Sequence, residues 1–105
     1  PNNMQLVNDD YAVNKDFYDS LTAVKEGRVY AQVAYNWYTT NVETAVVDAY
    51  YAGKVIFPEQ FADIDIEIKA NEVYTTLLGK EASTYYKDMT ENGLAWKQLK
   101  IGEEL

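Results

Sequence analysis

Apolar residues recur with helical spacing in four stretches of the chain, and they predict helices over about 8–25, 42–53, 66–78 and 82–91. Residues 28–33 instead alternate between apolar and polar side chains, as in a strand with one buried face. The pattern therefore predicts a mostly helical α/β chain with about four helices and one or two strands.

The helix after Val42 has the most regular pattern. Thr40 followed by Glu43 matches a capping box, in which each of the two side chains bonds to the backbone N–H of the other residue. Gly53 is expected to end this helix in a left-handed conformation. Asp48 and Glu43 flank the apolar stripe, so we expect both carboxylates to face solvent. The stripe itself consists of Val42, Ala45, Val46, Ala49 and Tyr50.

Two other helices have clear boundary signals. Asn8 or Asp9 is the expected cap of the first helix, and Asn14 is a candidate break within it. Asp65 is the expected cap of the third helix, and Gly79 is its expected end. The apolar stripes are Phe17, Leu21 and Val24 in the first helix and Ile66, Ala70, Val73 and Leu77 in the third.

The strand over 28–33 needs a partner for its backbone N–H and C=O groups. The C-terminal segment 94–105 is one candidate, and a second molecule is another. We favour a third arrangement, in which the chain is part of a larger domain and the other strands lie outside this sequence. An exposed strand edge would also allow a dimer of this chain.

Composition and charge exclude several classes of function. The chain has 105 residues and a formal net charge of −8, a length that suits one domain or part of one. The acidic balance argues against nucleic acid as a partner, because surfaces that bind nucleic acid are basic. The absence of histidine and cysteine excludes Ser-His-Asp triads, thiol nucleophiles and zinc–thiolate sites. We therefore expect that the protein is not an enzyme and that it has no metal site and no cofactor. An enzyme that uses carboxylates or tyrosine as catalytic groups is an alternative.

The strongest functional candidate is the aromatic and polar segment between the strand and the second helix. Ligands of open α/β sheets bind at the carboxyl ends of strands, and the amino end of a helix offers free N–H groups. The rings suit stacking on a ligand, and the amides and hydroxyls add donors and acceptors. Alternatively, the rings fold back over the helix and fill a core. The candidate residues are Tyr35, Asn36, Trp37, Tyr38, Thr39, Thr40 and Asn41.

Two metal-binding patterns fit less well. Phenolate oxygens suit ferric ion, and the chain has ten tyrosines, but a tyrosine side chain ionises only near a pKa of about 10 and direct ligation needs several such groups. Asp63, Asp65 and Glu67 alternate along the chain, but the glycine and the final glutamate of a calcium loop are missing. Helix capping by Asp65 explains this segment better.

Several segments resemble the C-terminal lobe of the substrate-binding proteins of ABC importers for iron complexes and cobalamin. The resemblance begins with AVKEGRVY at 23–30 and continues with YNWYTTNVE at 35–43. The YNWYTTN loop is typical of a subset described as binders of iron compounds. The similarity covers roughly residues 9–81, fades after Tyr85, and includes 48–61, 70–74 and 78–80.

The resemblance implies a two-lobed periplasmic-binding-protein fold with the ligand held between the lobes. Residues 1–105 would form a single partial domain, a truncated C-terminal lobe without its N-terminal lobe. It also implies an extracytoplasmic location (periplasmic or anchored at the cell surface), an ABC permease as partner, and an iron chelate such as a siderophore, haem or a related metal complex as ligand. Residues 35–41 match the loop that faces the cleft. The alternative is a small Tyr-rich, non-catalytic module that binds a carbohydrate or another partner.

Overall fold

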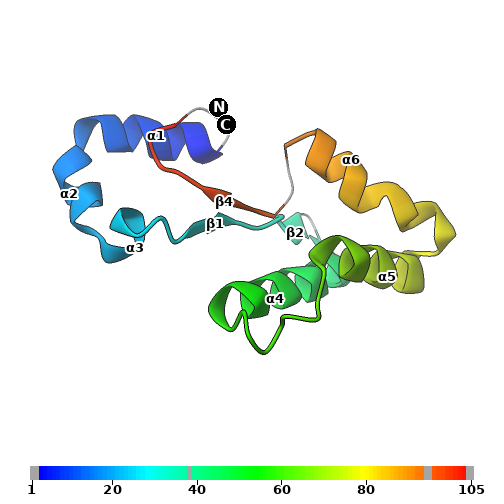
Figure 1. Ribbon diagram of the computed structural model, residues 1–105. Helices are drawn as coiled ribbons and strands as arrows, with labels where there is room; N and C mark the ends of the chain where they lie inside the picture. Colours follow the sequence, from blue (N-terminus) through cyan, green and yellow to red (C-terminus); the bar gives the residue numbers. More distant parts are fainter. Residues whose placement is uncertain (1–2, 38, 94–95, 104–105) are drawn as a thin grey trace. The chain divides into compact units, whose positions relative to one another are not determined.

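The computed structural model describes residues 3–37, 39–93 and 96–103 (Figure 1). The described chain is a mostly helical α/β structure, with 62% helix, as the apolar spacing predicts. It divides into two compact units. Unit 1 consists of the described residues up to Ala31 and from Lys97 onward, and unit 2 runs from Gln32 to Trp96.

Unit 1 contains three short helices and a two-stranded antiparallel sheet (Figure 1). Neighbouring helices pack against each other, and the two strands pair. The elements are α1 (Asn3–Val13), α2 (Lys15–Ser20), α3 (Thr22–Lys25), β1 (Val29–Ala31) and β4 (Lys97–Leu99).

The C-terminal segment supplies the partner of the predicted strand. β1 and β4 are antiparallel, with Val29 opposite Leu99 and Ala31 opposite Lys97. Tyr30 is more exposed than its two neighbours, which confirms the predicted alternation. Our preference for partner strands outside this sequence is therefore wrong for this edge of β1. Each strand still has one edge that pairs with no other strand among the described residues.

The first helix begins earlier than predicted. α1 starts at Asn3, so Asn8 and Asp9 lie inside the helix and do not cap it. The predicted break at Asn14 is confirmed, and a second break follows at Leu21, where an extended backbone separates α2 from α3. The N-terminal stretch is thus three short helices rather than one.

Unit 1 has little buried apolar surface. Among its described residues, Leu99 is the only buried hydrophobic side chain. The predicted stripe of the first helix does not face a core, because Phe17 is 63% exposed and Leu21 is 40% exposed. Val13, at the end of α1, is also exposed. Large apolar side chains therefore face outward along α1 and α2.

Unit 2 is organised around two longer helices that lie side by side, α4 and α5 (Figure 1). A 3₁₀-helix, η1, packs on α5, and α6 packs on both of them. A short antiparallel hairpin, β2 and β3, precedes α4. The bounds are β2 (Asn36–Trp37), β3 (Thr39–Thr40), α4 (Val42–Ile56), α5 (Ile66–Leu78), η1 (Lys80–Thr84) and α6 (Tyr85–Glu91).

The core of unit 2 joins these helices to the residue that precedes β4. Tyr86 of α6 stacks on Trp96, with ring centroids 5.7 Å apart and an interplanar angle of 7°. Such a parallel pair adds to the free energy gained by burying the two rings. The buried core residues are Val47, Ala70, Tyr74, Ala82 and Trp96.

Two predictions for the start and the face of α4 are wrong. The N-cap is Asn41 and no side chain caps the helix, so Thr40 and Glu43 do not form a capping box. The buried face consists of Thr44, Val47 and Asp48. Val42, which begins the predicted stripe, is 58% exposed. The buried face therefore differs from the predicted apolar stripe. Thr44 and Asp48 can face the core because both form hydrogen bonds inside unit 2.

Gly53 lies inside α4 rather than ending it, because the helix continues to Ile56. Glycine is needed at this position because the Phe61 ring leaves no room for a side chain. A Cβ atom at this position would lie 2.5 Å from Cζ of Phe61, which is closer than two carbon atoms can approach without a shift. The helix thus passes the Phe61 ring at a distance that only glycine permits.

Both predicted ends of α5 are confirmed. The Asp65 side chain accepts a hydrogen bond from the backbone N–H of Ile68 at 3.0 Å. Gly79 follows the helix with φ at +93°, a conformation that glycine adopts without strain. The predicted stripe is confirmed at Ala70, which is fully buried, but Leu77 is 55% exposed.

Candidate functional site

The segment predicted to bind a ligand forms a β-hairpin directly before α4. The strands are antiparallel, and the register places Asn36 opposite Thr40. The Asn41 N–H donates a hydrogen bond to the carbonyl oxygen of Tyr35 at 2.6 Å. This bond joins the two ends of the segment 35–41, so the segment is a closed loop fixed to the first turn of the helix.

The hairpin directs polar side chains toward solvent. Tyr35 is 46% exposed, so its ring does not fold back into a core, and Asn41 is half-buried. Tyr38 lies outside the described residues, and Trp37 is described by its backbone pairing alone. The exposed side chains of the hairpin and its entry are Tyr35, Asn36, Thr39 and Thr40.

A pocket of about 330 Å³ opens beside the hairpin within unit 2. We call it the acidic pocket, because Glu43 and Asp88 are its only charged side chains. Only Asn41 belongs both to the acidic pocket and to the predicted ligand-binding segment. The other lining residues are Val33, Ala34, Thr44, Tyr74, Tyr85 and Met89. Sequence reasoning did not find this pocket.

Tyr74 forms the buried wall of the acidic pocket. Its hydroxyl and that of Thr44 are 2.8 Å apart and share a hydrogen bond, and its ring meets Tyr85 edge-on with centroids 5.6 Å apart. Burial raises the pKa of Tyr74 above its ordinary value of 10.0, and the negative charges of Glu43 and Asp48 add to this rise, while the bond to Thr44 opposes it. The negative charges of Glu43 and Asp48 thus lie close enough to Tyr74 to oppose its ionisation.

Asp48 is buried, which contradicts the expectation that it faces solvent. Its side chain is only 7% exposed. The indole N–H of Trp96 donates to Asp48 Oδ1 at 2.5 Å, and the backbone N–H of Val33 donates to the same carboxyl group. Burial raises the pKa of Asp48, and the two hydrogen bonds oppose that rise. The carboxylate has a structural role in holding three segments of unit 2 together.

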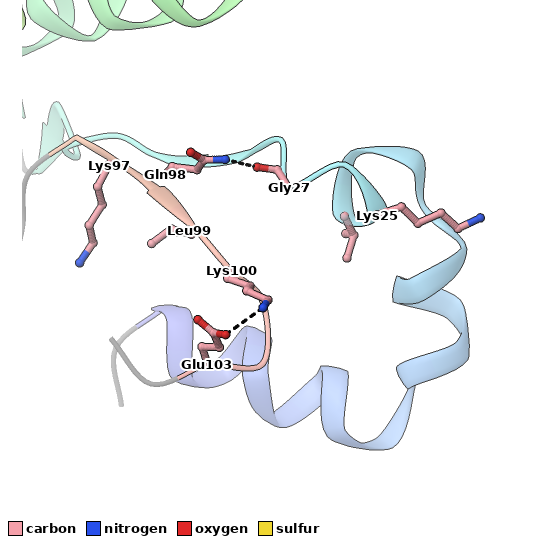
Figure 2. A pocket seen from close by; sticks show the side chains of 8 residues that line it. Lys25, Gly27, Lys97, Gln98, Leu99, Lys100 and Glu103 are labelled. Carbon is pink, nitrogen blue, oxygen red and sulfur yellow. Dashed lines mark hydrogen bonds and ion pairs between the residues drawn. The ribbon is translucent and has the colours of Figure 1, made fainter.

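Unit 1 has a larger pocket of about 540 Å³ (Figure 2). The side chain of Gln98 in β4 donates to the carbonyl oxygen of Gly27, which lies in the turn before β1, at 2.5 Å. Lys100 pairs with Glu103 at 3.0 Å, and Figure 2 shows Lys25 and Lys97 pointing in different directions. The lysines thus do not converge on one point. The remaining lining residues are Val24 and Leu99.

Among the described residues, no group of three acidic side chains is placed to hold a metal ion. No described helix has the length and apolar character needed to cross a membrane. The reading of Asp63, Asp65 and Glu67 as a helix start rather than a calcium loop agrees with the observed cap at Asp65.

In comparisons with known proteins, the chain matches no family model and no curated sequence. The chain is therefore assigned to no family. The resemblance of segments 23–30 and 35–43 to importer proteins supports only a proposal of function.

Proposed function

We propose that this chain is part of the C-terminal lobe of the solute-binding protein of an ABC importer, and that the solute is an iron chelate such as a siderophore or haem. Residues 35–41 supply this lobe's share of the binding site. The observation that carries the proposal is the exposed hairpin at 36–40, which presents polar side chains directly before the first turn of α4.

The hairpin has the chemistry that a non-covalent chelate site needs. The exposed Tyr35 ring offers a face for stacking, and Asn36, Thr39 and Thr40 offer amide and hydroxyl groups to the chelate oxygens. Because the Asn41–Tyr35 hydrogen bond already closes the loop, binding costs less ordering of the backbone. Capture and delivery of a chelate require no catalytic group.

The exposed apolar side chains of unit 1 support the proposal that this chain is part of a larger protein. Leu6, Val13 and Phe17 of α1 and α2 are each more than half exposed. These side chains belong to two helices that pack on each other, and a contiguous apolar patch is typical of surfaces that another part of a protein covers. A lobe that packs against further strands and helices of a two-lobed protein needs such surfaces.

Equilibrium dialysis of the whole chain with haem and with a ferric hydroxamate siderophore tests the proposal. A complete site with Kd of about 1 μM corresponds to about −8.2 kcal/mol, so half of the contacts leave about −4.1 kcal/mol, or Kd of about 1 mM. We expect saturable binding in this range to one of the two chelates. Tyr35→Ala is expected to weaken it about fivefold, since one stacked ring contributes about 0.5–1.5 kcal/mol.

Tyr30→Ala is the matched control, because Tyr30 is a similarly exposed tyrosine of unit 1. It is expected to leave chelate binding unchanged. The proposal fails if neither chelate binds, or if the two alanine variants bind equally well. Saturable binding of a neutral oligosaccharide, lost in Tyr35→Ala, would instead support the carbohydrate-binding alternative.

A further inference from the structure

The two carboxylates of the acidic pocket have no basic partner. Neither Glu43 nor Asp88 is within ion-pair distance of a lysine or arginine among the described residues. Two other acids of unit 2 do have such a partner, since Glu72 pairs with Lys69 at 2.9 Å and Glu91 pairs with a lysine one helical turn away. The pocket thus holds two uncompensated negative charges on different helices, α4 and α6.

Apart from the polar side chains of Asn41 and Thr44, the rest of the lining is apolar or aromatic. Val33 and Met89 offer aliphatic surface, and the ring of Tyr85 is 42% exposed. Ammonium groups bind to the faces of aromatic rings as well as to carboxylates. Burying the methylene groups of a ligand against such an apolar wall favours binding, because it removes apolar surface from water. The lining therefore suits a cation that carries an aliphatic chain.

We propose that the acidic pocket binds a small aliphatic diamine or polyamine, with one ammonium group at Glu43, a second at Asp88, and the methylene chain against Tyr85 and Met89. The volume of about 330 Å³ equals the space of roughly eleven water molecules at about 30 Å³ each. That is enough for a chain of about six to ten carbon and nitrogen atoms.

A bare metal ion fits this pocket less well. Calcium takes six to eight oxygen ligands, and magnesium needs an octahedral set. The described residues bring no three acidic side chains together for such a set. An organic cation needs fewer ligands, because its apolar part contributes to binding.

The test is an NMR titration of the ¹⁵N-labelled chain with putrescine and with spermidine, at low and at physiological ionic strength. We expect saturable shifts at residues of the acidic pocket and weaker binding at the higher ionic strength. The neutral analogue 1,4-butanediol is expected to cause no such shifts. Glu43→Gln and Asp88→Asn are each expected to weaken binding about fivefold, the upper end of what an exposed ion pair contributes.

Glu59→Gln removes one charge from an exposed acid of unit 2 that does not line the pocket. It is expected to change amine binding less than twofold. Equal weakening in all three variants would overturn the proposal, because it would show attraction to the net charge of −8 alone. An absence of saturable shifts would also overturn it. Tyr35→Ala is expected to keep amine binding, so the amine site and the chelate site are tested separately.

Discussion

The buried hydrogen bond between Trp96 and Asp48 should be a large single contribution to the stability of unit 2. Asp48 is 7% exposed and accepts two hydrogen bonds, one from the Trp96 indole and one from the Val33 backbone. Replacing Asp48 by alanine leaves both donors without their acceptor in a region that little water reaches. We therefore expect Asp48→Ala to destabilise the protein strongly.

The magnitude follows from the two bonds and the cost of burial. A hydrogen bond to a charged group contributes about 1.5–3 kcal/mol, so the two bonds to Asp48 together contribute about 3–6 kcal/mol. Burial of the carboxylate offsets part of this gain, as the raised pKa of Asp48 indicates. We expect Asp48→Ala to lower the free energy of unfolding by about 3 kcal/mol, at the lower end of the range.

Urea denaturation followed by far-UV circular dichroism measures this loss, since the signal does not depend on either tryptophan. Trp96→Phe and the double variant complete a thermodynamic cycle. The coupling between Asp48 and Trp96 is expected to be about 2 kcal/mol. Asp63→Asn, at an exposed position, serves as the control and is expected to change stability by less than about 0.5 kcal/mol. A coupling below about 0.5 kcal/mol would refute the reasoning.

The pH dependence gives a second measurement on the same group. The folded protein holds the Asp48 proton more tightly than the unfolded chain does, because the pKa of Asp48 is raised from 3.8. Its contribution to stability is thus fully present below pH 3.8 and decreases as the pH rises through the folded-state pKa. We therefore compare the free energy of unfolding of the wild type with that of Asp48→Asn. The wild type should lose stability relative to the variant between pH 3.8 and the folded-state pKa, and the difference should be constant at higher pH. A constant difference between the two proteins would contradict the assignment.

Three further predictions concern helix ends and packing in unit 2, and all are measured by the same urea denaturation. Asp65→Ala removes the cap that accepts from the Ile68 N–H and should cost about 1 kcal/mol, whereas Asp65→Asn should restore most of it. Gly53→Ala should destabilise by about 1 kcal/mol despite the better helix propensity of alanine, because of its clash with Phe61; a more stable variant would contradict the packing. Asn71→Leu should stabilise by about 1 kcal/mol, because the buried Asn71 Oδ1 has no hydrogen-bond partner among the described residues; a loss of stability would indicate that this oxygen is solvated.

Local signals in the sequence predicted α5 well. Asp65 and Gly79 act within one helical turn of themselves, so their effect on the backbone is readable from neighbouring residues. The break at Asn14 is of the same kind. The capping box before α4 failed although its residue types match, since Thr40 belongs to the hairpin, where it pairs with Asn36.

The buried face of α4 could not be predicted from the helix alone. Thr44 and Asp48 are polar, and an apolar stripe places such residues in solvent. Both are buried because partners far away in the sequence satisfy them, Tyr74 for Thr44 and Trp96 for Asp48. The only signal in the sequence was the indole of Trp96, which needs a hydrogen-bond acceptor when it is buried.

The same reasoning explains why the sequence marked residues 35–41 as a candidate segment, without predicting their hairpin, and missed the acidic pocket. The hairpin is a continuous segment whose register follows from short-range pairing. The pocket instead combines the start of α4 with Tyr74 of α5 and Asp88 of α6, so it exists only after the helices pack. Because the Thr44–Tyr74 hydrogen bond holds the first turn of α4 against α5, the helix packing that forms the pocket also fixes Asn41, where the hairpin ends. Hydrogen bonds of this kind have a narrower geometry than apolar contacts, which gives the candidate site a more rigid base than an apolar face would.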